Sequence, residues 1–277
     1  MAEAVQAEQR RIVIPYSPRK HFLAAHASKK RFEFDCRHRR AGKTVYLVNR
    51  LGRAALENKR KYPFPRYIYV ADTYSHAKDL VWWYLKHFFG EIPGMDFKET
   101  ELRAIFPNGA EIRLYSGDRS LDSIIGTYID GAALDEYPLL SPYILDSVIN
   151  PCLADFKGFC IISGTIPGRP DVDSEHFHAL YRQHLNDPDW DIFITPVTET
   201  DAIDPEEVER LRRDMSATAF AREMLCDFNV PAEDAIYVNE LNAAEIDGRI
   251  TSVPYEPSLP VVTWWDIGMD DRTAIWF

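Results

Sequence analysis

The sequence predicts an α/β domain with a mainly parallel central sheet flanked by helices. Short apolar runs of strand length alternate along the chain with amphipathic segments of helix length. The first of these runs enters a loop that ends in Gly-Lys-Thr, and a helical segment follows the loop at once. With 277 residues, of which 46% are hydrophobic, the chain is long enough to bury a large core.

Each predicted strand is a short apolar run rich in β-branched and aromatic residues and bounded by turn-forming residues. The strand candidates are 31–36, 67–72, 110–117, 128–136, 158–165 and 191–199. Helices are expected over 44–60, directly after the first strand, and over 75–90, where Leu80, Tyr84 and Phe88 share one face. Strands that alternate with helices in this way favour a parallel sheet with crossover connections.

The pattern changes after residue 200. Segment 205–228 is helical and begins with Pro205 and two glutamates, as the first turn of a helix prefers. A polar segment with several prolines then has the composition of a linker, and a new strand pattern follows it. The expected parts are a core over 1–200, a small helical subdomain over 201–230, a linker over 231–260 and the start of another domain over 261–277.

Charge is distributed unevenly along the chain. The net charge is -11, yet residues 1–66 contain 17 Lys and Arg against 5 Asp and Glu, a net charge of +12. A basic segment in an acidic protein indicates where phosphate groups would bind, although basic residues also serve simply to solvate a surface. No apolar run approaches the ~20 residues that a bilayer span needs, so an intracellular protein with no membrane contact is expected. The four cysteines lack C-x-x-C spacing and are expected to be reduced.

The loop between the first strand and helix has the form of a phosphate-binding loop with one departure. Its sequence CRHRRAGKT, from Cys36 to Thr44, carries Arg37 where the pattern G-x-x-x-x-G-K-[ST] has its first glycine. A strand, a tight loop and a helix N-terminus together form a phosphate cradle, in which Lys43 reaches the β- and γ-phosphates and Thr44 binds Mg²⁺. A bare Gly-Lys-Thr also begins helices that bind no ligand, so the flanking strand and helix carry this prediction.

Two acidic residues end the strand candidate at 128–136. Asp135 and Glu136 close the apolar run in AALDEYP, where one carboxylate can hold Mg²⁺ and the other can polarise an attacking water. The simpler explanation is that two exposed acids happen to end a strand. Their separation of some 90 residues from the Gly-Lys-Thr loop, with two strand candidates between, instead favours one site formed by the acids and the loop together. The next strand ends in Ser163, Gly164 and Thr165, whose hydroxyl groups could sense a γ-phosphate.

Several stretches together resemble the large terminase subunit of tailed bacteriophages, the motor that packages viral DNA. In chain order they are CRHRRAGKT, YIYVADTYSHAKDLVWWYLK, GTYIDGAALDEY, IISGTIPGR and FAREMLCDF. The resemblance extends over about residues 15–277, and motors of this family carry an arginine in place of the early glycine of the loop. It implies an ASCE-type P-loop NTPase fold with a small helical lid, formed here by 205–228, that hydrolyses ATP with Mg²⁺.

The resemblance also implies roles for individual residues. The nucleotide-binding residues would be Arg37, Arg39, Arg40, Ala41, Gly42, Lys43 and Thr44. Thr44 and Asp135 would hold Mg²⁺, while Glu136, as the catalytic base, and Arg39 would act in catalysis. Ser163, Gly164 and Thr165 would form the motif that couples hydrolysis to DNA movement.

Two positions depart from the pattern of the family. Many relatives have a glutamine that contacts adenine near YSPRKHF, where this chain has His21 and Phe22. Relatives also often carry an arginine directly before the glycine equivalent to Gly126, and this chain has Ile125 there. Arg119 or Arg169 could then supply the arginine finger that a neighbouring subunit inserts, although loop arginines are more often simply solvated.

The C-terminal WWDIGMDD resembles the first strand of the RNase H-like nuclease domain of the family. Asp266 would be its first metal ligand, and two-metal cleavage needs further carboxylates, which would lie beyond Phe277. We therefore expect ATPase activity without nuclease activity from this chain.

The implied partners are ATP, Mg²⁺, duplex DNA, the portal protein and the small terminase subunit, with copies of the chain assembled in a ring in the cytoplasm of a bacterial host. Two alternatives stay open at this point. Another nucleic-acid motor such as a helicase would share the phosphate loop and the Asp-Glu pair, and an inactive prophage remnant would bind nucleotide without turnover.

Overall fold

A computed structural model describes residues 13–119, 121, 123–168 and 174–230 of the chain, with short pieces at 240, 243–244, 247–249, 258, 260, 262–266 and 274–276. By its internal contacts the chain divides into two units, residues 1–234 and 235–277, which are described separately below. None of the described helices combines the length and the hydropathy that a membrane span requires.

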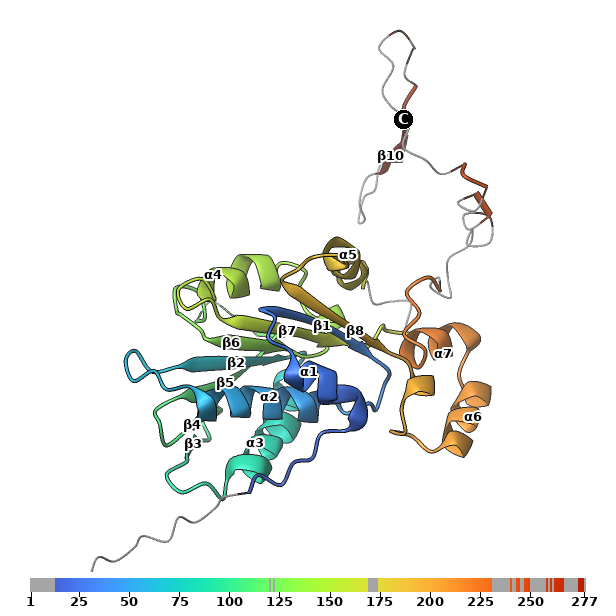
Figure 1. The fold of residues 1–277 in the computed structure, drawn as a ribbon. Coiled ribbons are helices and arrows are strands. Elements are labelled where there is room, and N and C mark those ends of the chain that lie inside the picture. The colour runs from blue at the N-terminus through green and yellow to red at the C-terminus, as the bar shows by residue number, and fades with distance from the viewer. Residues whose placement is uncertain are drawn as a thin grey trace, which may run out of the picture. The chain divides into compact units, whose positions relative to one another are not determined.

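The first unit is built on an eight-stranded sheet (Figure 1). Its strands are β1 (Phe32–Arg37), β2 (Arg66–Ala71), β3 (Asp96–Lys98), β4 (Arg103–Ile105), β5 (Glu111–Ser116), β6 (Gly131–Leu134), β7 (Phe159–Gly164) and β8 (Trp190–Thr195). They lie in the order β3-β4-β5-β2-β6-β7-β1-β8, and all pairs from β5 to β8 are parallel. The prediction of a mainly parallel sheet is therefore confirmed.

Helices cover both faces of this sheet (Figure 1). On one side lie η1 (Lys20–Phe22), α1 (Leu23–Ala27), α2 (Lys43–Glu57), η2 (His76–Val81) and α3 (Trp82–Phe89), and on the other η4 (Ile144–Ile149), α4 (Asn150–Cys152) and α5 (Glu175–His184). Each face has its own hydrophobic cluster, because successive side chains of a strand point to opposite sides. In β2, Tyr69 belongs to the first cluster, whereas Ile68 and Val70 belong to the second.

The parallel strand order places β7 between β1 and β6. β1 carries the phosphate-like loop at its carboxyl end, and β6 ends directly before Asp135 and Glu136. Because all three strands are parallel, their carboxyl ends meet at one edge of the sheet. This arrangement brings together loops that are about 90 residues apart in sequence.

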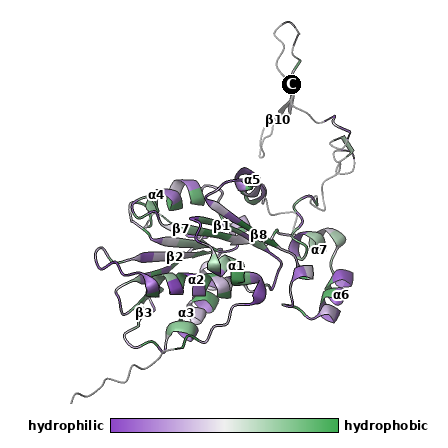
Figure 2. Ribbon diagram, viewed as in Figure 1, coloured by the Kyte–Doolittle hydropathy of each residue, from purple (hydrophilic) through white to green (hydrophobic). Residues whose placement is uncertain are grey.

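Two short helices, α6 (Pro205–Asp214) and α7 (Ala217–Glu223), follow η5 (Val197–Glu199) after the last strand. The side chain of Asp204 caps α6 by accepting from the Glu206 amide, and Ser216 caps α7 in the same way from Ala219. Figure 2 shows α6 as largely hydrophilic, and none of its residues is buried. A separate small cluster around Val197, Phe220 and Met224 packs these helices.

The elements agree with the sequence prediction in type and differ in detail. The helix expected at 44–60 ends at Glu57, and the one expected at 75–90 begins as a wider π-helical turn, η2, before α3. The antiparallel edge strands β3 and β4 and the helix α5 were not predicted. All four cysteines are free and buried, as expected.

The second unit contains β9 (Trp264–Asp266) and β10 (Ala274–Trp276), which pair antiparallel. The strand expected near the C-terminus is thus present at Asp266. Most of the expected linker over 231–260 lies outside the described residues.

Candidate active site

The loop from β1 to α2 has the backbone of a tight cradle. Gly42 lies in the left-handed region with φ +103°, which favours glycine, and Arg40, which is exposed, also has a positive φ of 73°. The carbonyl oxygens of buried Ala41 and of Arg40 accept hydrogen bonds from Arg19 Nη1 over 2.8 and 3.2 Å. Arg19 was not singled out in the sequence, because nothing in its local pattern signals a contact with a loop 22 residues away.

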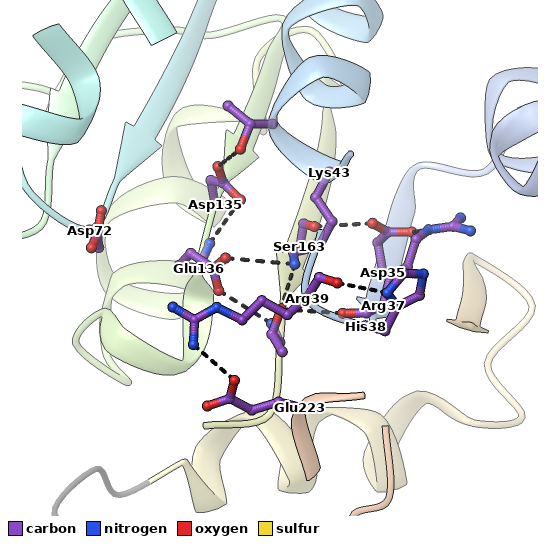
Figure 3. A network of polar contacts seen from close by, with 12 residues as sticks. Asp35, Arg37, His38, Arg39, Lys43, Asp72, Asp135, Glu136, Ser163 and Glu223 are labelled. Carbon is purple, nitrogen blue, oxygen red and sulfur yellow. Dashed lines mark hydrogen bonds and ion pairs between the residues drawn. The ribbon is translucent and has the colours of Figure 1, made fainter. Parts of the chain in front are cut away.

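Lys43 begins α2 and is the central cation of the site (Figure 3). Its side chain is buried, its Nζ donates to Thr165 Oγ1 over 2.5 Å, and it lies 3.6 Å from Glu136 Oε1. Burial lowers the pKa of Lys43, but Glu136 and Asp135 outweigh burial, so on balance its pKa is raised. The ammonium group is therefore charged and held at the carboxyl ends of β6 and β7.

Thr44 and Asp135 lie side by side and could serve as oxygen ligands of a metal ion. The Thr44 hydroxyl donates to Asp135 Oδ2 over 3.0 Å, and the buried Tyr69 hydroxyl donates to the same oxygen. Asp135 Oδ1 accepts from the Glu136 amide over 3.0 Å, and the whole carboxylate is buried. Oxygen donors of this kind fit Mg²⁺, so the residues present match the ion that the sequence predicts.

Glu136 is a partly exposed residue of the site and has an unusual backbone conformation. It adopts φ +49° and ψ +46°, the left-handed region that a non-glycine residue enters only at a cost of about 1–3 kcal/mol. Its side chain is 30% exposed, and Oε2 accepts from the Thr165 amide over 3.3 Å. Burial is the main cause that raises the pKa of Glu136, while Lys43 opposes the rise. A carboxylate with a raised pKa is better able to accept a proton.

The three residues that end β7 and follow it have different surroundings. Thr165 contacts both Lys43 and Glu136, and its hydroxyl also donates to the Arg37 carbonyl over 3.2 Å. The Ser163 hydroxyl instead donates to buried Asp35 over 3.0 Å. Gly164 lies against Pro138, where an added Cβ would come within 2.4 Å of the proline ring. Of the predicted coupling motif, Thr165 is the member whose side chain reaches the site.

Arg37 was expected to bind the nucleotide, but its side chain is buried below the loop. Its guanidinium is fully buried, with Nε 2.5 Å from Asp35 Oδ1 and Nη1 bonded to the His21 carbonyl and the Thr195 hydroxyl. The Phe22 ring covers the guanidinium, with Arg37 Cζ 4.2 Å from the ring centroid. The structure thus places this side chain in the core beneath the loop, where it joins β1, β8 and the N-terminal segment.

Arg39 extends outward and meets the helical subdomain (Figure 3). Its Nη1 lies 2.9 Å from Glu223 Oε2, and its amide donates to the Glu223 carbonyl over 2.9 Å. Glu223 Oε1 in turn accepts from the Gly168 amide over 3.2 Å. Glu223 was missed in the sequence, since an acid at the end of a helix gives no signal of a partner 184 residues away.

A histidine at the start of η2 and an acid just before that element also face the site. His76 Nδ1 lies 2.6 Å from Asp72 Oδ1, and its Nε2 lies 4.0 Å from Asp135 Oδ2. The hydrogen bond with Asp72 is the largest cause of a raised pKa at His76. Neither residue was predicted, although both belong to the stretch YIYVADTYSH, which contains the second strand and the residues directly after it.

Two adjoining clefts connect these groups. One, of about 1110 Å³, runs from the loop to the helical subdomain, and the other, of about 460 Å³, lies over the end of β7. They share Arg39, His76, Glu136 and Glu223. Apolar side chains of the subdomain line the larger cleft, among them Ile203, Leu211 and Met215. A molecule with both phosphate and apolar parts fits this lining.

The remaining predicted residues are dispersed. His21 Nε2 lies 3.1 Å from the Ala41 carbonyl, and Phe22 is buried against Tyr46, so Phe22 belongs to the core. Arg119 is exposed in the loop after β5, with its guanidinium 3.5 Å from the centroid of the Tyr74 ring. Arg169 and the side chain of Asp266 lie outside the described part of the chain.

Comparison with solved structures identifies proteins that share the fold of this chain. No protein-family model matches the sequence, and no curated protein matches it. The large terminase ATPase domain of Thermus phage P74-26 superposes with a TM-score of 0.62 at 20% identity, over 78% of this chain and 95% of that domain.

Two further solved structures give a similar result. The large terminase from a thermophilic bacteriophage superposes with a TM-score of 0.62 at 17% identity, over 75% of this chain and 53% of its own. The HK97 bacteriophage large terminase gives 0.53 at 14% identity, over 82% of this chain and 45% of its own. The described sheet, the loop and the helices that flank them therefore have the fold of a phage large terminase ATPase domain.

Proposed function

We propose that this chain is an ATP-hydrolysing motor of viral DNA packaging, which moves duplex DNA into a procapsid as a large terminase subunit does. The observation that carries the proposal is the convergence of Lys43, Thr44, Asp135, Glu136 and Thr165 at one edge of the sheet. The large terminase from the thermophilic bacteriophage, which shares the fold, has been solved in complex with ATP-γ-S and with ADP.

In this proposal each group of the site has a task. Lys43 neutralises phosphate charge, and to do so its ammonium leaves the Thr165 hydroxyl that it contacts in this structure. Thr44 and Asp135 would hold Mg²⁺, which when bound offsets the charge on the phosphate oxygens. Glu136 accepts the proton of the attacking water, as a partly exposed carboxylate with a raised pKa can do.

The helical subdomain would respond to the nucleotide through Arg39. This arginine joins the phosphate loop to Glu223 at the end of α7, and both residues line the clefts on either side. If Arg39 turns toward a phosphate, its ion pair with Glu223 is broken, and Glu223 is then held in place by the Gly168 amide. In the proposal, α6 and α7 act as a lid that changes position with the state of the nucleotide.

The remaining parts of the proposal concern assembly. Copies of the chain would form a ring on the portal protein in the host cytoplasm, with the small terminase subunit as a further partner. Exposed Arg119, or Arg169, would enter the site of the neighbouring copy and stabilise the charge that develops on the phosphoryl group. Its position beyond β5, at the same edge of the sheet as the site, supports this role for Arg119.

ATP turnover by the purified chain, measured with and without duplex DNA, tests the proposal. We expect magnesium-dependent turnover that duplex DNA stimulates, without strand separation. Strand separation driven by ATP would indicate a helicase instead. Nucleotide binding without any turnover, alone or with DNA, would indicate an inactive remnant.

A further inference from the structure

The edge of the sheet opposite the candidate active site gathers four connections. Strands β2, β6, β7 and β1 are neighbours and parallel, so the segments that enter them all lie at the edge where the strands begin. We call these segments, residues 28–31, 58–65, 126–130 and 153–158, the basic edge. All of them are described by the structure.

The basic edge carries a charge opposite to that of the whole protein. Its four segments contain seven Lys and Arg and two Asp, in a chain whose net charge is -11. One of the two acids, Asp130, is neutralised, because Arg60 meets both of its carboxylate oxygens over 2.5 and 2.6 Å. The connection into the neighbouring strand β8 is acidic instead, with Asp187 and Asp189, and limits the basic edge on that side.

Four ammonium groups of this edge are free to meet a ligand. Lys29, Lys59, Lys61 and Lys157 are exposed, and none of their ammonium groups makes a hydrogen bond or ion pair with a residue that the structure describes. By contrast, the exposed lysines Lys86 and Lys98 are paired with Glu99 and Asp96. Lys29 and Lys157 also line a hollow of about 370 Å³, together with Arg31 and Arg50.

Aromatic side chains lie among these cations. Tyr62 is 88% exposed, Phe64 52% and Phe156 37%, which is unusual for three aromatic residues in one region of a folded surface. Arg60 stacks on Phe156 at 3.6 Å from the ring centroid, and thus holds the ring and the charge together. Cations interleaved with exposed rings match a ligand that presents phosphates next to apolar sugar faces.

We propose that the basic edge binds the sugar-phosphate backbone of duplex DNA. The inference rests on the proposed function and adds to it the surface on which DNA is held. Four neighbouring strands at about 4.8 Å spacing span about 14 Å, close to the ~12 Å width of the major groove. Lysines at the two ends of the edge, Lys29 before β1 and Lys59 and Lys61 before β2, can therefore meet phosphates of both DNA strands across a groove.

DNA and the nucleotide would bind at opposite edges of the sheet. DNA would lie at the strand starts, whereas the nucleotide site lies at the carboxyl ends of the same strands. Variants of the basic edge should therefore change DNA binding and leave nucleotide binding unchanged. This difference also allows the failure of this inference to be told from the failure of the proposed function.

The test compares two triple variants of the full chain in anisotropy titrations with a short labelled duplex. One variant combines Lys59→Ala, Lys61→Ala and Lys157→Ala at the basic edge. The control combines Lys78→Ala, Lys86→Ala and Lys98→Ala, which removes the same number of exposed lysines elsewhere, two of them paired with acids. Affinity is measured between about 50 and 200 mM KCl, and binding of a fluorescent ATP analogue is measured in parallel.

Each phosphate contact contributes about 0.9 to the slope of log K against log salt, so three lost contacts should lower the slope by about 2.7. We expect this loss, with at least a tenfold weaker affinity at low salt, for the edge variant alone, with unchanged nucleotide binding. An edge variant that binds duplex as tightly as the control overturns the inference, even if ATP turnover supports the proposed function. Preference for single-stranded DNA that Tyr62→Ala abolishes would also overturn it, in favour of base stacking.

Discussion

Replacement of the buried acid Glu33 by glutamine should stabilise the protein, and more so at high pH. Glu33 lies on β1 with 3% of its surface exposed, and its Oε1 accepts from the Tyr46 hydroxyl of α2 over 2.6 Å. Burial, together with neighbouring Asp35, raises the pKa of Glu33 to about 8 from its ordinary value of 4.5. The acid is therefore protonated in the folded protein at neutral pH, and it ionises on unfolding.

The sign and size of the effect follow from proton linkage. Between pH 4.5 and about 8 the folded state holds a proton that the unfolded state has lost, so the free energy of unfolding falls as pH rises. The slope from this one group is at most about 1.4 kcal/mol per pH unit. Glutamine keeps the carbonyl oxygen that Tyr46 needs and does not titrate, so the Glu33→Gln variant lacks this slope.

Urea unfolding of wild type and Glu33→Gln at several pH values between 5 and 8.5 measures the difference. We expect the advantage of the variant to grow with pH up to about pH 8 and then to level off. Glu57→Gln is the matched control, because Glu57 lies on the surface of α2 and pairs with exposed Arg53. A stability difference between Glu33→Gln and wild type that does not change with pH would refute the reasoning.

Three other predictions concern the site itself. Lys43→Ala should lose nucleotide binding and turnover together, because the ammonium neutralises phosphate charge in both ground and transition states. Titration with a labelled nucleotide checks this prediction. Turnover near the wild-type rate would exclude the phosphate cradle. Arg119→Ala should lower ATP turnover at high protein concentration, where copies would assemble in the proposal, and spare it at low concentration. An equal loss at every concentration would argue against a role in the neighbouring copy. Gly164→Ala should destabilise the fold by about 1–3 kcal/mol in urea unfolding, since its Cβ would meet Pro138 at 2.4 Å, and an unchanged midpoint would contradict that close approach.

The sequence predicts the parallel sheet and the convergence of its loops well, because those depend on local patterns. The strand, loop and helix around Lys43 are found at 32–57 as expected, and the acids after β6 fall at the same edge. The edge strands β3 and β4 were missed because each has only three residues, too short for an alternating pattern to stand out.

The side-chain directions could not be predicted from the sequence. Arg37 and Arg39 are two residues apart, yet one is buried against Asp35 and the other reaches Glu223 in the helical subdomain. Which arginine faces the cleft depends on where the loop turns after β1 and on partners far away in the chain. The same holds for Arg19, whose hydrogen bonds to the loop carbonyls depend on the path of the N-terminal segment.

The most direct test of the central claim is ATP turnover and nucleotide affinity of Glu136→Gln, measured on the same preparation. The amide can still hydrogen-bond a water but cannot take its proton, so turnover should fall by about 100- to 10,000-fold while affinity for ATP with Mg²⁺ is retained. The hydrogen bonds from Thr44 to Asp135 and from Lys43 to Thr165 do not involve the Glu136 side chain, so we expect them to persist in this variant. Turnover close to that of wild type, or loss of nucleotide binding together with turnover, would contradict the assignment of Glu136 as the catalytic base.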